Sequence, residues 1–235
     1  MVMPSTSKNN RGRFMIYGLL LLIVLLAGGA LAITAFGGED TPGEDSAEAG
    51  FLRDMSVHHT QAVEMAMIIR DRTDDEQLKS MATDIAFTQT SQIGTMQGFL
   101  NVWDLSPTGE QGQMAWMGHE VEGRMPGMAS PEEIELLRTL PVAEAETLFL
   151  QLMNRHHIAG VDMAQAVIDR SDNDDIIEMA ESMIRVQNAE IDIMNIHLEE
   201  RGAEPVTHEN VDELVIDMGA GATPAASPAE DHSGH

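Results

Sequence analysis

Two adjacent histidine pairs, each flanked by methionines, are the residues of this chain best suited to chemistry. They are Met55, His58, His59 and Met65 in the first half, and Met153, His156, His157 and Met163 in the second. A methionine and a histidine four residues apart, as at Met55 and His59, lie one turn apart on a helix face and can approach one ion. Imidazole and thioether both suit copper, and thioether favours Cu(I). The pattern therefore indicates a copper site that needs no thiolate.

The same residues could instead be packing residues. Methionine often fills irregular gaps in a core, and we interpret Met81, Met179 and Met183 in this way. One buried histidine is usually a hydrogen-bonded core residue. Four of them, in two adjacent pairs on buried faces, are costly to bury for packing alone, which favours metal binding.

A Gly- and Met-rich stretch at 106–130 lies between the two halves and supplies weaker candidate ligands, His119, Met125 and Met128. Flexible Met-rich loops also occur as plain hydrophobic covers. We therefore expect this stretch to be an irregular connection that crosses a helical bundle, with either role open to it.

The histidine pairs belong to an internal repeat with an offset of 98 residues, which holds without a gap from Phe51/Phe149 to Leu100/Leu198. Such a repeat is one supersecondary unit used twice. Each copy predicts two antiparallel helices, over 46–71 and 75–103 in the first and over 142–170 and 174–201 in the second. Both histidine pairs fall on the apolar face of the first helix of their copy. Because neither hairpin can bury its apolar stripe alone, we predict an all-α four-helix bundle. Approximate twofold packing would bring the two histidine pairs face to face.

Two capping signals mark predicted helix starts. Thr41 can cap a helix with Glu44 three residues later, and Ser130 can do so with Glu133. The second signal predicts a short extra helix that Pro141 ends, after the connection at 104–130 and within the second hairpin unit, 131–202.

Composition excludes several classes of function. The net charge of -26 argues against nucleic acid, since phosphate binding needs Lys and Arg. Cysteine is absent, which excludes disulfides and thiolate metal sites. A di-iron enzyme of the ferritin type would need Glu-x-x-His on two helices, and the sequence has none. No nucleophile–base constellation is visible either, so we do not expect an enzyme.

The first residues predict a membrane anchor. An uncharged run at 14–38 is long enough to span a bilayer. Basic residues before it and acidic residues after it place 1–13 in the cytoplasm and the rest outside. The alternative is a cleaved signal peptide, with a small-residue site at Ala30-Leu31-Ala32, which would leave a secreted or periplasmic protein. We expect the bundle to occupy 39–202. The remainder, 203–235, predicts a weak helix near 209–218 and a disordered tail, whose His232 and His235 have no expected fixed role.

With these residues in hand, the chain resembles the family called domain of unknown function 305. The resembling motifs are Met55-x-x-His58-His59-x-x-x-Val63-x-Met65-Ala66, Met153-x-x-His156-His157-x-x-Gly160-Val161-x-Met163-Ala164, Met125-Pro126-Gly127-Met128 and Gln187-x-x-Glu190-Ile191-x-x-Met194. The resemblance implies a ferritin-like bundle and, for some members, periplasmic copper binding. It adds Glu190 and Met194 as weaker candidate ligands. The first copy departs from the pattern, because Gln92 stands where the second has Glu190.

Together these observations predict a single-pass, outward-facing helical bundle that binds copper, with Cu(I) favoured, and buffers it or passes it to an unknown copper-handling partner. One alternative is a structural or interaction bundle with buried histidines and no metal. Another is a ferritin-like redox enzyme.

Overall fold

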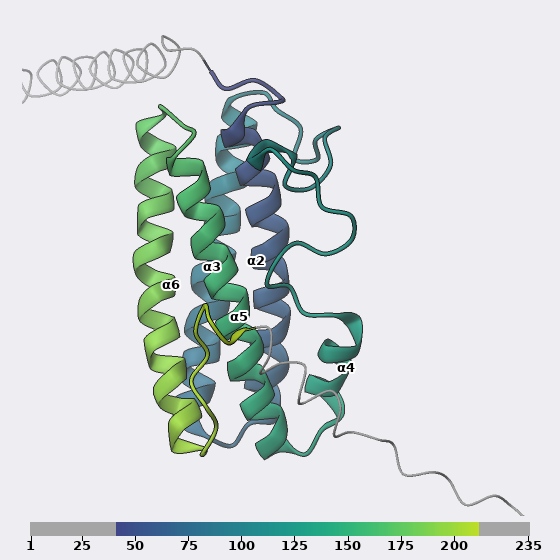
Figure 1. The fold of residues 1–235 in the computed structure, drawn as a ribbon, viewed down its shortest axis with the longest axis vertical. Coiled ribbons are helices and arrows are strands. Elements are labelled where there is room, and N and C mark those ends of the chain that lie inside the picture. Colours follow the sequence, from purple (N-terminus) through teal and green to yellow (C-terminus); the bar gives the residue numbers. More distant parts are fainter. Residues whose placement is uncertain (1–40, 212–235) are drawn as a thin grey trace, which may run out of the picture. The chain divides into compact units, whose positions relative to one another are not determined.

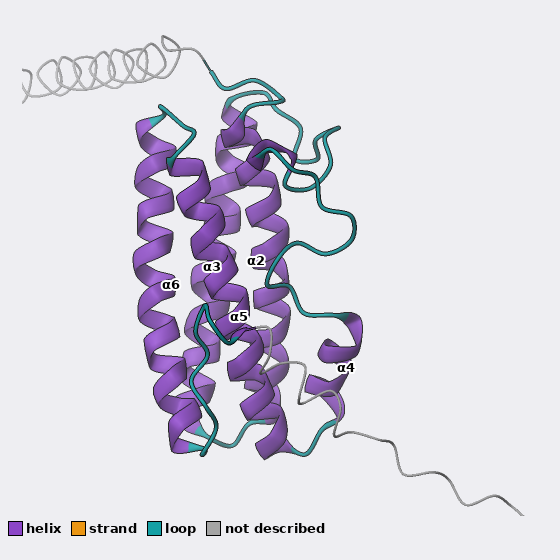
Figure 2. Cartoon of the chain, in the orientation of Figure 1, coloured by secondary structure: helices purple, strands orange, loops and turns teal. Residues whose placement is uncertain are grey.

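The computed structural model describes residues 41–211, and in this range it contains helices and turns but no strand (Figure 1; Figure 2). The elements are α2 (Ala47–Arg72), α3 (Glu76–Val102), the 3-10 turn η1 (Ala115–Met117), α4 (Pro131–Thr139), α5 (Val142–Ile168) and α6 (Asp174–Glu200). The four long helices begin and end within two residues of their predicted bounds. The predicted all-helical bundle is therefore confirmed for these residues.

The cap of α2 differs from the predicted one. Ser46, rather than Thr41, precedes the first helical residue, and its Oγ accepts a hydrogen bond from the backbone N–H of Ala49 at 3.1 Å. Glu44 lies in the turn before the helix and pairs with Arg53 instead of closing a capping box. Ser46 caps the helix in place of Thr41 because it stands directly before the buried face of the helix, which begins at Ala49.

The two hairpins meet along α2 and α5, which run in opposite directions through the bundle (Figure 1). α3 packs on α2, and α6 packs on α5. The first helix of each repeat copy is thus central, and this is the helix that carries the histidine pair. α5 is buried on almost every side from Leu148 to Gly160, because α4 and the end of the connection also lie against it.

The connection between the hairpins, residues 104–130, lies against α2 and covers it on one side (Figure 1). We call this segment the cover. The buried carboxylate of Asp54 accepts hydrogen bonds from the backbone N–H of Met114 at 2.8 Å and from Nε1 of Trp116 at 2.9 Å. Further along, the side-chain amide of Gln61 exchanges two hydrogen bonds with the backbone of Ala129. Asp54 and Gln61 thus hold two separate parts of the connection to one helix.

The predicted capping box of α4 is present. Ser130 Oγ accepts from the backbone N–H of Glu133, and the Glu133 carboxylate accepts from the backbone N–H of Ser130. The same carboxylate receives two hydrogen bonds from Arg155 of α5. The short helix is thereby tied to the centre of the bundle.

The predicted anchor at 14–38, the terminal 1–13 and the tail histidines lie outside the described residues, as does most of the weak helix predicted at 209–218. Within 41–211, none of the helices combines the length and the apolar character needed to cross a membrane.

Candidate metal centre

The four histidines lie together at the contact between α2 and α5. None of them is more than 1% exposed. The rings of His58 and His156 stack with their centroids 3.7 Å apart and their planes inclined by 32°. His156 and His157 follow at a centroid separation of 6.1 Å. The antiparallel crossing of two copies of one repeat thus places both histidine pairs in a single buried layer.

Each of the four rings uses Nε2 for a hydrogen bond to an oxygen. The acceptors are two backbone carbonyls, of Pro126 for His58 at 3.1 Å and of His58 for His156 at 2.8 Å, and two side-chain oxygens, of Gln92 for His59 at 2.8 Å and of Glu190 for His157 at 2.7 Å. Backbone carbonyls and a carboxylate can only accept, and the amide of Gln92 presents its oxygen, so Nε2 is the donor in each case. The same tautomer is therefore set in all four rings, with the proton on Nε2.

The other ring nitrogen, Nδ1, is buried and has no hydrogen-bond partner in any of the four histidines. A buried polar atom without a partner is costly. Here the cost is repeated four times in one layer, and each bare atom is a lone pair, because the proton is on Nε2. This arrangement matches that of metal-binding histidines, which donate the far N–H to a carbonyl or carboxylate and coordinate with the remaining nitrogen.

Burial keeps three of these rings neutral. Desolvation lowers the pKa of His58 to about 4, against the opposing hydrogen bond to the Pro126 carbonyl. Desolvation, with the nearby His58 ring adding to it, lowers the pKa of His59 to about 3. Desolvation also brings the pKa of His156 well below its ordinary value. A neutral imidazole is the form that coordinates a metal.

The predicted methionine ligands separate into two buried clusters. One contains Met55 and Met163, and the other contains Met65, Met153 and Met194. Met96, the repeat counterpart of Met194, was not a predicted ligand and lies in the first cluster. Each cluster thus receives one member of every pair related by the repeat. Twofold packing therefore divides these thioethers evenly between the two clusters.

Histidine and carboxylate side chains do not complete a site alone. Among the residues described, no three His, Asp or Glu side chains are placed to hold one ion together. A site in this layer would therefore have to use thioether sulfur beside imidazole nitrogen. That donor set is soft and suits Cu(I).

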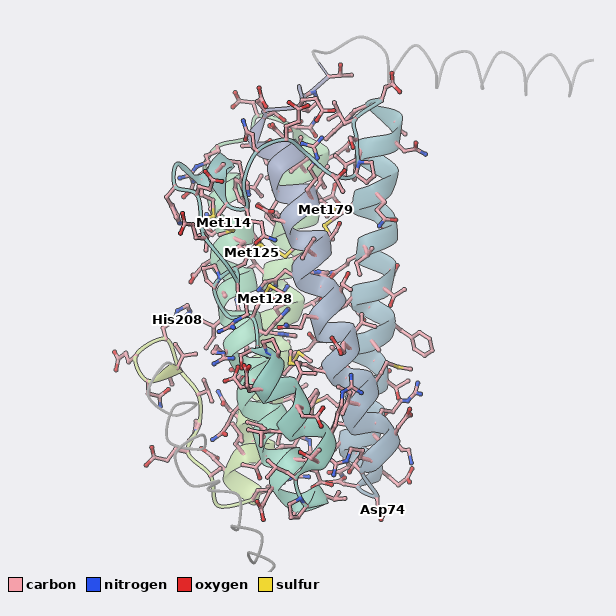
Figure 3. All side chains as sticks on the ribbon, turned by 90° about the vertical axis from the view of Figure 1, so that its right-hand side faces the viewer. Asp74, Met114, Met125, Met128, Met179 and His208 are labelled. Atoms are coloured by element: carbon pink, nitrogen blue, oxygen red, sulfur yellow. The ribbon has the colours of Figure 1, made fainter. Side chains whose placement is uncertain are left out.

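The weaker candidates divide into buried and exposed residues. Met114, Met125 and Met128 follow one another along the connection (Figure 3), and the first two are about 1% exposed. They pack into the hydrophobic cluster that contains Met55. His119 is exposed to solvent and does not join the histidine layer. Glu190 contacts His157 through the ring nitrogen opposite the bare Nδ1.

A family model, "Domain of unknown function (DUF305)", matches residues 48–198. The chain belongs to the DUF305 family. The matched range spans both hairpins and the connection between them.

Solved structures with the same fold include two DUF305 proteins and CopM. A protein of Streptomyces coelicolor, predicted to be secreted, is 46% identical, with a TM-score of 0.67, and the match covers 71% of this chain and 100% of that one. A DUF305 fragment from Deinococcus radiodurans is 31% identical, with a TM-score of 0.57, and the match covers 66% of this chain and 96% of the fragment. CopM in its Cu(II)-bound form is 23% identical, with a TM-score of 0.55, and the match covers 66% of this chain and 97% of CopM. No curated protein matches the chain.

Sequence reasoning assigned no role to three residues, Asp54, Pro126 and Gly127, through which the connection contacts α2 and α5. The Pro126 carbonyl that accepts from His58 is a backbone atom and leaves no mark in the sequence. Asp54 could have been noticed, since it is a carboxylate beside Met55 on a buried face, at a position where the second copy has Leu152. Gly127, which follows Pro126, lies against α5.

Gly127, which follows Pro126, allows a test of how tightly the connection packs against α5. Gly127 has φ of 77°, and a Cβ on it would lie 2.5 Å from the Cβ of Ala159 and 2.8 Å from the carbonyl oxygen of Arg155. Gly118 has φ of 93° with nothing within 4 Å. We expect Gly127→Ala to lower the free energy of unfolding by about 3 kcal/mol, from backbone strain and steric clash together. Gly118→Ala should lower it by about 1 kcal/mol, from strain alone.

Urea denaturation of the two variants beside the parent measures both losses. Equal losses for Gly118→Ala and Gly127→Ala would mean that the cover yields at Gly127 and does not hold the Pro126 carbonyl in place over His58.

Proposed function

We propose that this DUF305 protein binds copper, with Cu(I) favoured, in the buried histidine layer between α2 and α5. The observation that supports this most directly is the set of four unpartnered Nδ1 atoms, each made a lone-pair donor by the hydrogen bond that its Nε2 makes. Buried polar groups normally find a hydrogen-bond partner, and four ring nitrogens of one kind without a partner in a single layer form a ready set of ligands.

The ligands we assign are drawn from the imidazoles of His58, His59, His156 and His157 and the thioethers of Met55, Met65, Met153 and Met163, with at most two imidazoles on one ion. All eight side chains are buried, and the clusters of methionine include Met96 and Met194 as further sulfur donors. Neutral rings and soft sulfur together suit Cu(I) better than Zn(II), to which thioether contributes little.

The fold likeness to CopM, for which Cu(I)-bound and Cu(II)-bound forms are known, supports a copper ligand for the same bundle. The complete absence of cysteine supports it in another way, since a site of His and Met works in an oxidising compartment where thiols would pair.

We also propose that the protein acts outside the cytoplasm as a copper buffer or carrier rather than as an enzyme. The charge asymmetry around 14–38 supports export, by an uncleaved anchor or by a cleaved signal. The likeness to the Streptomyces coelicolor protein, which is predicted to be secreted, supports the same compartment. The lack of a nucleophile–base constellation in the sequence supports a binding role.

The experiment that tests the proposal is a competition titration of the full chain against a chromogenic Cu(I) chelator, with metal analysis of the purified protein. We expect stoichiometric copper, held against the chelator, and weaker binding of Zn(II). Failure to retain any Cu(I) would favour a structural bundle with buried histidines. Catalytic turnover of the copper-bound protein with a reductant and oxygen as substrates would instead favour a ferritin-like redox enzyme.

A further inference from the structure

Corresponding histidines in the two copies of the repeat have hydrogen-bond partners of different charge. His59 donates to the neutral side-chain amide of Gln92, and His157 donates to the carboxylate of Glu190. Both partners come from the second helix of the same hairpin, 33 residues along the chain from their histidine. The geometry is the same in both halves, with distances of 2.8 Å and 2.7 Å, and only the charge differs.

This difference determines how much negative charge lies beside the proposed copper centre. The ligands that we assign are neutral imidazoles and thioethers, so a bound cation brings a charge that none of them offsets. Glu190 is the one carboxylate that is bonded to the histidine layer within 41–211. Its side chain is 17% exposed, so its charge is only partly screened by water.

Other charged groups near the layer are engaged elsewhere. Arg155, beside His156, is paired with Glu133. Asp54, one turn before His58, faces the connection and accepts from Met114 and Trp116. Neither side chain hydrogen-bonds to a histidine.

We propose that Glu190 is the counter-charge of the copper centre and that Gln92, in the equivalent position, keeps this counter-charge at one. The centre with a monovalent ion is then neutral, whereas a divalent ion leaves one uncompensated positive charge in a buried site, which is unfavourable. The inference rests on the proposed copper site and adds a feature that disfavours Cu(II), because the neutral Gln92 withholds the second negative charge that a divalent ion would need. Glu190 acts through His157 as a positioning and charge-setting residue, without itself holding the ion.

The two copies provide their own isosteric variants. Glu190→Gln gives the second copy the chemistry of the first, and Gln92→Glu does the reverse. The double variant moves the carboxylate from one half to the other and leaves the total charge unchanged. The measurements are Cu(I) affinity by chelator competition, Ag(I) affinity as a monovalent probe without redox chemistry, and Cu(II) affinity, all on the full chain.

We expect Glu190→Gln to lower the affinities for Cu(I) and Ag(I) about tenfold or more, and that for Cu(II) by a larger factor, because the lost attraction grows with ionic charge. Gln92→Glu should raise the affinity for Cu(II) more than that for Cu(I). The double variant should bind Cu(I) within about threefold of the parent, since a counter-charge acts from either side at these distances.

The outcomes separate this inference from the proposed function. If the parent does not hold Cu(I) or Ag(I), the proposed copper site itself fails. If the parent binds them and Glu190→Gln binds equally well, only the counter-charge role is overturned. Thermal unfolding of the metal-free variants controls for folding. If Glu190→Gln binds weakly and the double variant, folded as stably as the parent, does not recover, Glu190 has a role specific to its position and the charge argument is overturned.

Discussion

Replacing His58, His59, His156 and His157 together by glutamine is expected to lower the Cu(I) affinity at least about 100-fold, a loss of roughly 3 kcal/mol or more. Glutamine has a side-chain nitrogen near the position of Nε2 and none at Nδ1. The variant therefore keeps donors for the four existing oxygen acceptors and removes the four bare lone pairs. The measurement is competition against a Cu(I) chelator, with circular dichroism to confirm the helical fold.

Two controls make this result specific to the buried layer. His119→Gln removes an exposed imidazole in the connection and should leave the Cu(I) affinity within about twofold of the parent. Deleting 219–235 removes His232 and His235 and should leave most of the binding. A folded quadruple variant that holds copper as tightly as the parent would contradict the site. The methionines of the connection, Met114, Met125 and Met128, would then become the leading ligands.

The histidine layer illustrates what the sequence could predict. The period of the apolar residues placed both histidine pairs on buried faces, and the gapless repeat implied that two copies of one hairpin pack together. The contact between His58 and His156 follows from those two premises once the central helices are antiparallel. Helix bounds were also predictable, because Asp75 and Asn173 cap α3 and α6 directly after short polar turns.

The hydrogen bonds that orient the rings were beyond the sequence. Two acceptors are backbone carbonyls, of Pro126 and His58, whose positions depend on tertiary packing. The other two, Gln92 and Glu190, were visible as a mismatch between the copies, but their role was not, because side-chain partners on another helix depend on how the helices pack. Sequence reasoning considered Glu190 a weaker ligand, whereas the structure places it behind His157.

Burial also changes the expected response to acid. An exposed histidine titrates near pH 6.5, and a copper site of exposed histidines would lose affinity through that pH. In this bundle desolvation lowers the pKa of His58 to about 4 and that of His59 to about 3. Protons therefore compete for these two nitrogens only at lower pH, and we expect Cu(I) affinity to decline near pH 4 rather than near 6.5.

The metal-free protein should lose stability between pH 6.5 and 4. Above pH 6.5 both rings are neutral in the folded and the unfolded chain, so their contribution to stability does not change with pH. Between pH 6.5 and 4 the unfolded chain binds protons at both positions, and the folded chain, whose pKa values are depressed, does not. Stability therefore falls as the pH falls through this window. Each unit of pKa depression corresponds to about 1.4 kcal/mol, which gives a loss of roughly 6 kcal/mol for the two rings by pH 4.

Urea denaturation at pH 7, 5.5 and 4.5, with and without one equivalent of Cu(I), measures this loss. We expect the midpoint of the metal-free protein to drop steeply and that of the copper-bound protein to drop less, because a ligand that binds only the folded state stabilises it. The quadruple glutamine variant has no titrating group in the layer, so its midpoint should change far less between pH 7 and 4.5. A parent midpoint as flat as that of the variant would show that the rings gain protons without unfolding, and hence that water reaches the histidine layer.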